Sequence, residues 1–507
     1  MISTFHGLET ARRALSSAQG ALYTTGHNIA NANTPGYSRQ RVNLVPGEPF
    51  PNPSLNRPAI PGQLGTGVKI DSIQRYREEF LDLQYRAENS KYGYWQARTD
   101  ALTKMEDIMN EPSESGIANN LDKFWTALQD LSVHPEDSGA RSVVRQRGIA
   151  LAETFNYVSD SLKMIQRDLQ KKTEATMQQI NSLIRQINNI NLQIAKVEPH
   201  GYVPNDLYDR RDLLVDELST YLNIKVERVN SGGAPSPVAE GLYTIKLIDE
   251  NGREMGVTLV DGKRFETQEL YIKYEELDGG EKGLIEKLYF GPPKTLESTP
   301  KDQLENVGGI TAFEIDQFRS YGRLLAEVEA FGYYGKNELG NTVEKGVYPD
   351  MINKLDIMVY TFVQEFNRVH RQGWSLNDIK NGERAEHNFF EFDADLSNPP
   401  KGAASSIRVS DAILAELDNI AAASTVGGDV VEFVSAYYED SGDPFEYYGA
   451  HPIVDGEYTG IDDVQLTLVF NQSAIPNYWS LQQTIDGVTT PVSITTDNNT
   501  ISYNGIK

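Results

Sequence analysis

The feature that most constrains the fold is a run of apolar residues at helical spacing between residues 151 and 197. Separations of three and four residues place these side chains on one face of a single helix. Such a helix would be roughly 80 Å long, far longer than a typical globular helix. A helix of this length predicts an elongated, rod-like body. The apolar positions are Leu151, Phe155, Val158, Leu162, Ile165, Leu169, Thr176, Ile180, Leu183, Ile187, Ile190, Ile194 and Val197.

Further helices with apolar faces flank this one. The same periodicity predicts helices over residues 95–109 and 117–131 before it, and over 321–330 and 351–369 after it. Pro199, Gly201 and Pro204 should end the long helix, because they break helical hydrogen bonding. These helices, packed side by side, predict a long antiparallel helical bundle.

Two regions show strand patterns instead. Residues 223–319 contain alternating apolar stretches joined by Asn251-Gly252 and Asp261-Gly262, both favourable hairpin turns. We therefore expect an inserted antiparallel β domain there. From about residue 425 to 507 strand patterns dominate again. The predicted fold class is α+β and multidomain.

The N-terminal forty residues carry a heptad repeat. Leucine or isoleucine recurs every seven residues, with alanine or threonine in the other half of the heptad, which is typical of a coiled-coil helix. A single apolar stripe must pack on another helix, of this chain or of a neighbour. An ordinary surface helix on a globular core is the alternative interpretation. The predicted self-assembly seam consists of Leu8, Ala11, Leu15, Ala18, Leu22, Thr25 and Ile29.

The heptad helix should stop at Thr34-Pro35-Gly36, because Pro followed by Gly favours a type II turn. Residues 40–75 are rich in Pro and Gly and predict an irregular arm with a small hairpin. The expected domains are 1–40, the heptad helix and turn; 41–222 plus about 320–424, the helical body; 223–319, the β insertion; and 425–507, the terminal β-rich domain.

Composition excludes several classes of function. The formal net charge is −25, which argues against nucleic acid and anionic membranes as main partners. The chain has no cysteine, so disulfides and thiolate chemistry are excluded. Its apolar runs fall far short of the roughly 20 residues that cross a bilayer, so membrane insertion is not expected. No cleavable signal is visible at the charged N-terminus.

We find no pattern that predicts catalysis, a cofactor or a metal site. The seven histidines are scattered, without a pair at i, i+4 and without the glutamate of a zinc protease motif. No phosphate-binding loop, dinucleotide fingerprint or nucleophile elbow is present. The sequence therefore predicts a protein that is not an enzyme.

Three segments, in this order, resemble flagellar axial proteins. The Asn/Ala-rich turn after the heptad helix is similar to the N-terminal signature of rod, hook and hook-associated proteins, and its Thr-Pro-Gly-Tyr-Ser-Arg form most resembles the hook-associated protein 1 family. Residues 204–214 and 366–377 are similar to two further motifs of that family. The first motif comprises Asn28, Asn31, Asn33, Thr34, Pro35, Gly36, Tyr37 and Arg39. The second comprises Asn205, Asp206, Leu207, Asp209, Arg210, Asp212 and Leu214.

The second motif also has a structural interpretation from its residues alone. Asn205 is expected to cap a helix after Pro204. Asp206 and Arg210 are spaced at i, i+4 for a salt bridge. Leu207 and Leu214 should share one face and pack on the long helix.

The resemblance implies a structural subunit that joins the flagellar hook to the filament. It implies export through the flagellar type III apparatus and assembly outside the cell, with a helical body like the D1 domain of flagellin. The implied partners are hook protein, the second hook-associated protein, further copies of the chain, and an export chaperone. Alternatives are another axial protein of the rod or hook, and a secreted coiled-coil adhesin.

The sequence departs from the family pattern at its C-terminal end. Family members carry a long C-terminal amphipathic helix that pairs with the N-terminal one. Here strands are predicted at Ile494–Thr496 and Ile501–Tyr503, followed by an Asn504-Gly505 turn. We therefore expect an incomplete terminal domain, in which the chaperone-binding region is absent.

Overall fold

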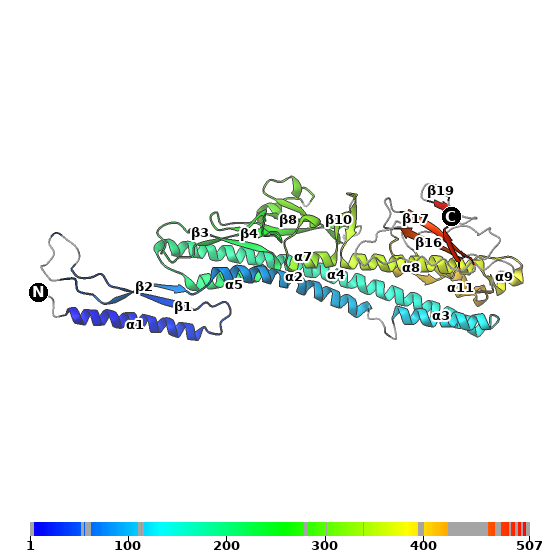
Figure 1. The fold of residues 1–507 in the computed structure, drawn as a ribbon, viewed down its shortest axis with the longest axis horizontal. Coiled ribbons are helices and arrows are strands. Elements are labelled where there is room, and N and C mark those ends of the chain that lie inside the picture. The colour runs from blue at the N-terminus through cyan, green and yellow to red at the C-terminus, as the bar shows by residue number, and fades with distance from the viewer. Residues whose placement is uncertain are drawn as a thin grey trace. The chain divides into compact units, whose positions relative to one another are not determined.

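The computed structural model describes most of the chain up to residue 423 and a set of strands beyond it (Figure 1). It divides into two compact units, Met1–Ala423 and Ser424–Lys507. The described residues are 5–51, 55, 62–109, 113, 116–277, 282–300, 302–337, 339–393 and 400–423, followed by the strands at 465–471, 478–485, 488–491, 495–497 and 500–502.

The first unit is built around one long helix, α4, which runs without a break for 60 residues. It begins earlier than predicted because the Asp137 side chain accepts a hydrogen bond from the Gly139 amide and caps it. The predicted apolar positions, such as Leu151 and Ile187, are buried, except Ile165 and Val197, which are half-buried. The main helices are α1 (His6–Ala30), α2 (Glu79–Met109), α3 (Ile117–Val133), α4 (Ser138–Val197), α5 (Asn205–Tyr221), α7 (Arg323–Phe331) and α8 (Val347–Gln372).

Five of these main helices pack on α4. Near its N-terminal half lie α3 and α8, and near its C-terminal half lie α2, α5 and α7 (Figure 1). The direction of α4 is opposite to that of α2 and α5. Buried side chains from these helices form one continuous apolar core. The predicted α+β class with a long antiparallel helical bundle is therefore confirmed.

Two sheets cover the C-terminal half of this bundle. The first has the order β3-β4-β5-β6, and the predicted hairpin turns join β4 to β5 and β5 to β6. The second sheet contains β7 to β11. Two of these strands, β10 and β11, follow α7 in the chain. The strands are β3 (Ile224–Val229), β4 (Leu242–Ile248), β5 (Glu254–Asp261), β6 (Glu266–Thr267), β7 (Glu269–Glu276), β8 (Lys282–Gly291), β9 (Thr311–Glu314), β10 (Tyr333–Lys336) and β11 (Thr342–Lys345).

Short elements follow α8, and several of them pack along it. There Asn367 accepts hydrogen bonds from the Phe389 and Phe390 amides and donates to the Phe390 carbonyl, which fixes an aromatic cluster. The elements are α9 (Leu376–Asn381), α10 (Ala403–Ser406), α11 (Asp411–Ala415), β12 (Trp374–Ser375), β13 (Phe390–Glu391), β14 (Arg408–Val409) and β15 (Ala421–Ala423), with α6 (Pro293–Ser298) earlier in the chain.

The described strands of the second unit form two small antiparallel sheets. One has the order β16-β17-β18 and the other pairs β19 with β20. The two last predicted strands are thus present but pair with each other, while the Asn504-Gly505 turn lies outside the described residues. The bounds are β16 (Gln465–Asn471), β17 (Tyr478–Ile485), β18 (Val488–Pro491), β19 (Thr495–Asp497) and β20 (Thr500–Ser502).

Candidate functional site: an exposed helix and its buried ion pairs

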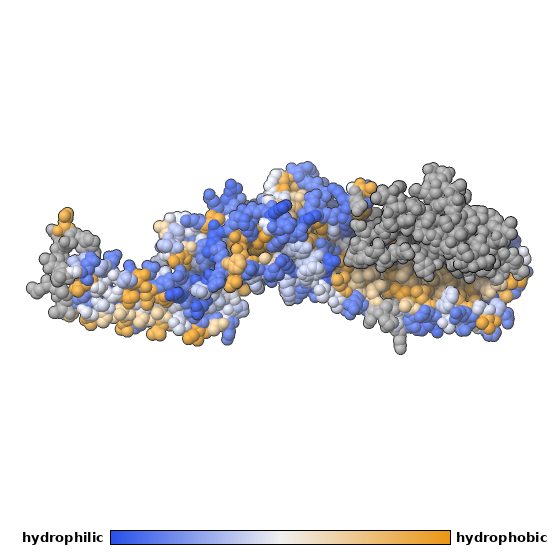
Figure 2. All heavy atoms as spheres, viewed as in Figure 1, coloured by the Kyte–Doolittle hydropathy of each residue, from blue (hydrophilic) through white to orange (hydrophobic). Residues whose placement is uncertain are grey.

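Helix α1 presents its heptad seam to solvent. Leu8, Leu15, Leu22 and Ile29 are 67%, 62%, 71% and 72% exposed, and Ala11, Ala18 and Thr25 are exposed as well. Figure 2 shows apolar surface along this helix. The structure therefore places all seven predicted seam residues on an open face, where another helix has room to pack.

The opposite face of α1 packs on a hairpin formed by β1 (Gln40–Pro46) and β2 (Val68–Arg75). Small residues allow this close approach: the Ser17 hydroxyl donates to the Val68 carbonyl at 3.1 Å, and Thr24 is buried. The predicted arm with a small hairpin is confirmed. We call residues 6–75, comprising α1, the turn and the hairpin, the assembly segment.

Helix α1 ends at Ala30, before the predicted stop at Thr34, because Asn31 leaves the helical backbone conformation. The turn at Thr34-Pro35-Gly36 that follows has the predicted geometry. Gly36 has φ +80°, and the Tyr37 amide donates to the Thr34 carbonyl at 3.2 Å, as a type II turn requires. Asn28 joins the helix to β1, because its side chain accepts from the Gln40 amide and donates to the Gln40 carbonyl, both at 2.9 Å. The Tyr37 hydroxyl donates to Asn28 Oδ1 at 2.8 Å.

The rest of the first motif supports this turn. Asn31 donates to the His27 carbonyl and accepts from the Thr34 hydroxyl, and the Arg39 guanidinium lies 5.4 Å from the centre of the Tyr76 ring. Asn33 and Pro35 are exposed.

The first motif lies directly against the second. A Cβ added at Gly36 would lie 3.0 Å from Leu213 Cβ on α5. The Ser38 amide donates to Asp209 Oδ1 at 3.2 Å, and Gln40 donates to Asp206 Oδ1 at 3.5 Å. Two segments that are about 170 residues apart in the chain thus form one joint between the assembly segment and α5.

Buried ion pairs hold this joint from the hairpin side. Arg75, at the end of β2, lies 2.7 Å from Asp209, 2.8 Å from Asp212 and 2.5 Å from Glu240. The Arg75 and Asp212 side chains are 1% and 0% exposed. Since buried charges are costly unless paired and hydrogen-bonded, this set of partners fixes the position of the hairpin relative to α5.

Three more arginines complete the cluster. Arg77 and Arg86 each pair with both Asp212 and Asp216. Arg211 donates to the Gly241 carbonyl at 2.6 Å and stacks on Tyr243, with 3.3 Å between its Cζ and the ring centre. We call Arg75, Arg77, Arg86, Arg211, Asp209, Asp212, Asp216 and Glu240 the ion-pair cluster.

The arginines determine the charge state of Asp212. Burial opposes its ionisation, but Arg75, Arg77, Arg211 and Arg86 outweigh burial and lower the pKa of Asp212 to about 2. The same carboxylates raise the pKa of Arg75 against the effect of its own burial. Asp212 and Arg75 therefore face each other as a charged pair at neutral pH.

Two details predicted for the second motif are wrong. Asn205 is the first residue of α5 and Pro204 precedes it in the cap position, so Asn205 instead donates its side-chain amide to the Ile73 carbonyl at 3.0 Å. In the described part of the chain no ion pair joins Asp206 to Arg210, and both side chains are exposed. Leu207 and Leu214 are half-buried in the core beside α4, as expected.

The arginines that pair with α5 were missed. Arg75, Arg77 and Arg86 stand at the end of a strand pattern and the start of a helix. Because the chain has a net charge of −25, arginines next to an amphipathic element could have been recognised as candidate partners of buried acidic residues. Their partners could not be assigned because the acidic residues lie more than 120 positions away.

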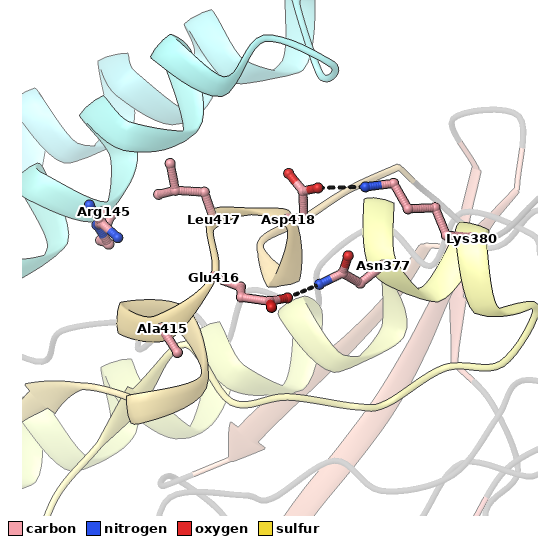
Figure 3. Close-up of a pocket in the computed structure, with 7 residues that line it drawn as sticks. All are labelled: Arg145, Asn377, Lys380, Ala415, Glu416, Leu417 and Asp418. Atoms are coloured by element: carbon pink, nitrogen blue, oxygen red, sulfur yellow. Dashed lines mark hydrogen bonds and ion pairs between the residues drawn. The ribbon is translucent and has the colours of Figure 1, made fainter.

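Elsewhere in the described residues a shallow groove lies between α4, α9 and α11 (Figure 3). Its volume is about 500 Å³. Lys380 pairs with Asp418 at 2.6 Å, and Asn377 donates to Glu416 at 2.6 Å, so these lining groups bind one another. No group of three or more potential metal ligands occurs among the residues searched, and no described helix has the length and hydropathy to cross a membrane.

The fold and the joint define an all-packing architecture in which an exposed amphipathic helix, α1, is held on a long helical body. Two family models match the chain: a flagella basal body rod protein model over residues 8–37, and the helical domain of flagellar hook-associated protein FlgK over residues 102–390. The chain belongs to the family of flagellar hook-associated protein 1. The family predicted from the three motifs is confirmed, and with it a structural protein of the bacterial flagellum.

Two relatives of known sequence agree with this assignment. Flagellar hook-associated protein 1 of Bacillus subtilis is 44% identical over 82% of this chain and 75% of its own length. The Salmonella typhimurium protein of the same name is 30% identical over 46% of this chain and 41% of its own length. A solved structure, the flagellar hook junction protein FlgK from Burkholderia pseudomallei, gives 17% identity and a TM-score of 0.45 over 84% of this chain and 59% of that chain.

Proposed function

We propose that this chain joins the flagellar hook to the filament outside the cell, by packing and without catalysis. The observation that carries the proposal is the exposed seam of α1, backed by the ion-pair cluster. An apolar heptad face supplies association energy, at roughly 25 cal/mol for each Å² of apolar surface removed from water. A buried set of ion pairs behind it transmits load to the helical body.

The proposal assigns a role to each part of the chain. The seam would pack against copies of the chain and, at the two ends of the assembly, against hook protein and the second hook-associated protein. The helical body at 41–222 and 320–424, the β insertion at 223–319 and the terminal β region would form the outer parts. Export through the type III apparatus, without a cleaved signal peptide, would deliver the chain, with an export chaperone binding near the C-terminal end of the family's proteins.

A gene deletion tests the proposal directly. The strain should build hooks but lose its filaments, and flagellin should accumulate in the medium because nothing retains it at the hook tip. Expression of the wild-type gene should restore filaments. Normal filaments in the deletion strain would contradict the junction role.

The rod-protein match at residues 8–37 keeps a rod or hook role as the second candidate. Electron microscopy of the same strain separates the two, because loss of a rod or hook protein also removes the hooks. A secreted adhesin would leave hooks, filaments and swimming unchanged.

A further inference from the structure

A second exposed apolar face lies on α2. Tyr85, Tyr92 and Trp95 are 57%, 62% and 59% exposed, and their separations place them on one side of the helix with two leucines. Tyr and Trp are the residue types that contribute most to protein interfaces. We call this face the α2 stripe; it consists of Leu81, Tyr85, Tyr92, Trp95 and Leu102.

A matching face lies on α4. Val143, Tyr157 and Met164 are 48%, 70% and 63% exposed, and with half-buried Ala150 they recur every seven residues. We call these four residues the α4 stripe. From Val143 to Met164, as from Leu81 to Leu102, the helix rises about 32 Å. The two stripes therefore have the same length, and Tyr85–Tyr92 and Trp95–Leu102 in the α2 stripe are also seven residues apart.

We propose that the α2 stripe of one copy packs against the α4 stripe of the next copy. This interface rests on the proposed function, because it needs copies that stand side by side in one orientation. Since α4 runs opposite to α2 within a copy, the two helices of neighbouring copies then meet antiparallel (Figure 1).

Shape supports this pairing. A shallow groove of about 480 Å³ lies at the start of the α2 stripe, lined by Leu81, Gln84, Tyr85, Ala87 and Glu88. When the stripes overlap fully and antiparallel, Met164 comes opposite Leu81 and Tyr157 comes opposite Glu88. Two large exposed side chains then fill the groove, and the Tyr157 hydroxyl faces a carboxylate that can accept its hydrogen bond.

Charge supports the same register. Lys91 and Glu153 are exposed beside the centres of the two stripes, and within its own copy Lys91 lies 2.8 Å from Glu88 in an exposed i, i+3 pair of small net stability. Lys91 lies four residues before Trp95, and Glu153 lies four residues before Tyr157. An antiparallel pair of helices therefore brings the two charges to one side, opposite each other. Arg98 would come opposite Arg147, but Arg98 is held within its own copy by Tyr94 at 2.7 Å and Glu329 at 3.4 Å.

The pairing also requires a stagger between copies. Lys172 lies 3.9 Å from Asp100, so Tyr92 is level with about residue 180 of its own α4. In the proposed interface Tyr92 lies beside Glu153 of the neighbour, about 27 residues before position 180 on α4. The neighbour must therefore be shifted by about 40 Å along the helix axis. A heterologous contact with an axial shift builds an open helical array and does not close into a flat ring.

Cysteine cross-linking tests the interface, and the chain has no cysteine of its own. A gene carrying Lys91→Cys and Glu153→Cys replaces the natural one, and isolated flagella are mildly oxidised. Within one copy these positions are too far apart for a disulfide, which needs Cα atoms within about 7 Å. We expect a ladder of dimers, trimers and larger species, with none from either single variant or from Lys91→Cys combined with Lys171→Cys.

Normal filaments without a ladder would overturn the interface and leave the junction role intact. Normal filaments in the deletion strain would overturn the junction role itself. A photo-reactive phenylalanine analogue at Tyr92 provides a second measurement if the cysteine pair disturbs assembly. Its cross-links should map to residues 150–164 of a second copy; cross-links to another flagellar protein would also overturn the interface.

Discussion

Arg75 and Asp212 form an ion pair of 2.8 Å whose side chains are almost completely buried, although one ends a hairpin and the other lies within α5. The pair joins the assembly segment to the helical body. Its partners Asp209 and Glu240 come from α5 and from the residues just before β4, so one guanidinium connects three parts of the chain.

Removing this guanidinium should strongly destabilise the joint. Arg75→Met keeps an apolar stem but leaves the three carboxylates without their closest cation, and breaking a buried pair in this way costs about 3–5 kcal/mol. Urea unfolding of the purified chain should show a loss of this size. Arg12→Met, which breaks an exposed pair with Glu9, should leave the unfolding free energy nearly unchanged, because solvent and salt screen exposed pairs. Equal effects of the two substitutions would contradict the structural role of the cluster.

The stability contributed by Asp212 should depend on pH. Because its pKa in the folded chain is about 2, below the ordinary value of about 3.9, its ionised form stabilises the fold at pH above about 4. This contribution, about 2 kcal/mol, is lost as the pH falls from about 4 towards 2. The difference in unfolding free energy between wild type and Asp212→Asn should therefore narrow over that range. A difference that stays constant from pH 6 to pH 2.5 would contradict the lowered pKa.

Gly36 should tolerate no side chain. It has φ +80°, where other residues are strained by about 1–2 kcal/mol, and a Cβ there would press on Leu213. Gly36→Ala should lower the unfolding free energy by at least this amount and weaken docking of the turn on α5. Gly26→Ala is the matched control, because nothing lies within 4 Å of a Cβ at that helical position. It should be neutral or slightly stabilising.

Amide hydrogen exchange should be faster in α1 than in the helical body. In the isolated chain, α1 is supported on one face only, so its amides should exchange orders of magnitude faster than those at the centre of α4. In isolated flagella the α1 amides should become protected. Strong protection of α1 in the isolated monomer would show that the seam has another partner within the chain.

The long-range architecture was predictable where a single periodicity decides it. The buried positions of α4 follow from spacings of three and four residues, and the turn at Gly36 follows from the preference of glycine for positive φ. Both depend on residues that are neighbours in the sequence. The heptad repeat of α1 could be recognised for the same reason.

The joint was not predictable, because its chemistry lies between distant segments. Asn205 looked like a helix cap, but its side chain is used by the Ile73 carbonyl of the hairpin. Asp212 was one of several acidic residues in the second motif, and the structure surrounds it with arginines from other elements. Nothing in local spacing identifies which acidic residue becomes buried, since that depends on which elements meet.

Flagellin release by a seam variant tests the central claim most directly. Leu15→Asp places a charge in the exposed α1 seam, and Ser16→Asp places the same charge on the adjacent exposed residue outside it. In the chromosomal gene, Leu15→Asp should produce hooks without filaments and release flagellin into the medium to the level of the deletion strain. Ser16→Asp should keep normal filaments. Normal filaments with Leu15→Asp, or equal flagellin release from both variants, would contradict the assignment of α1 as the assembly surface.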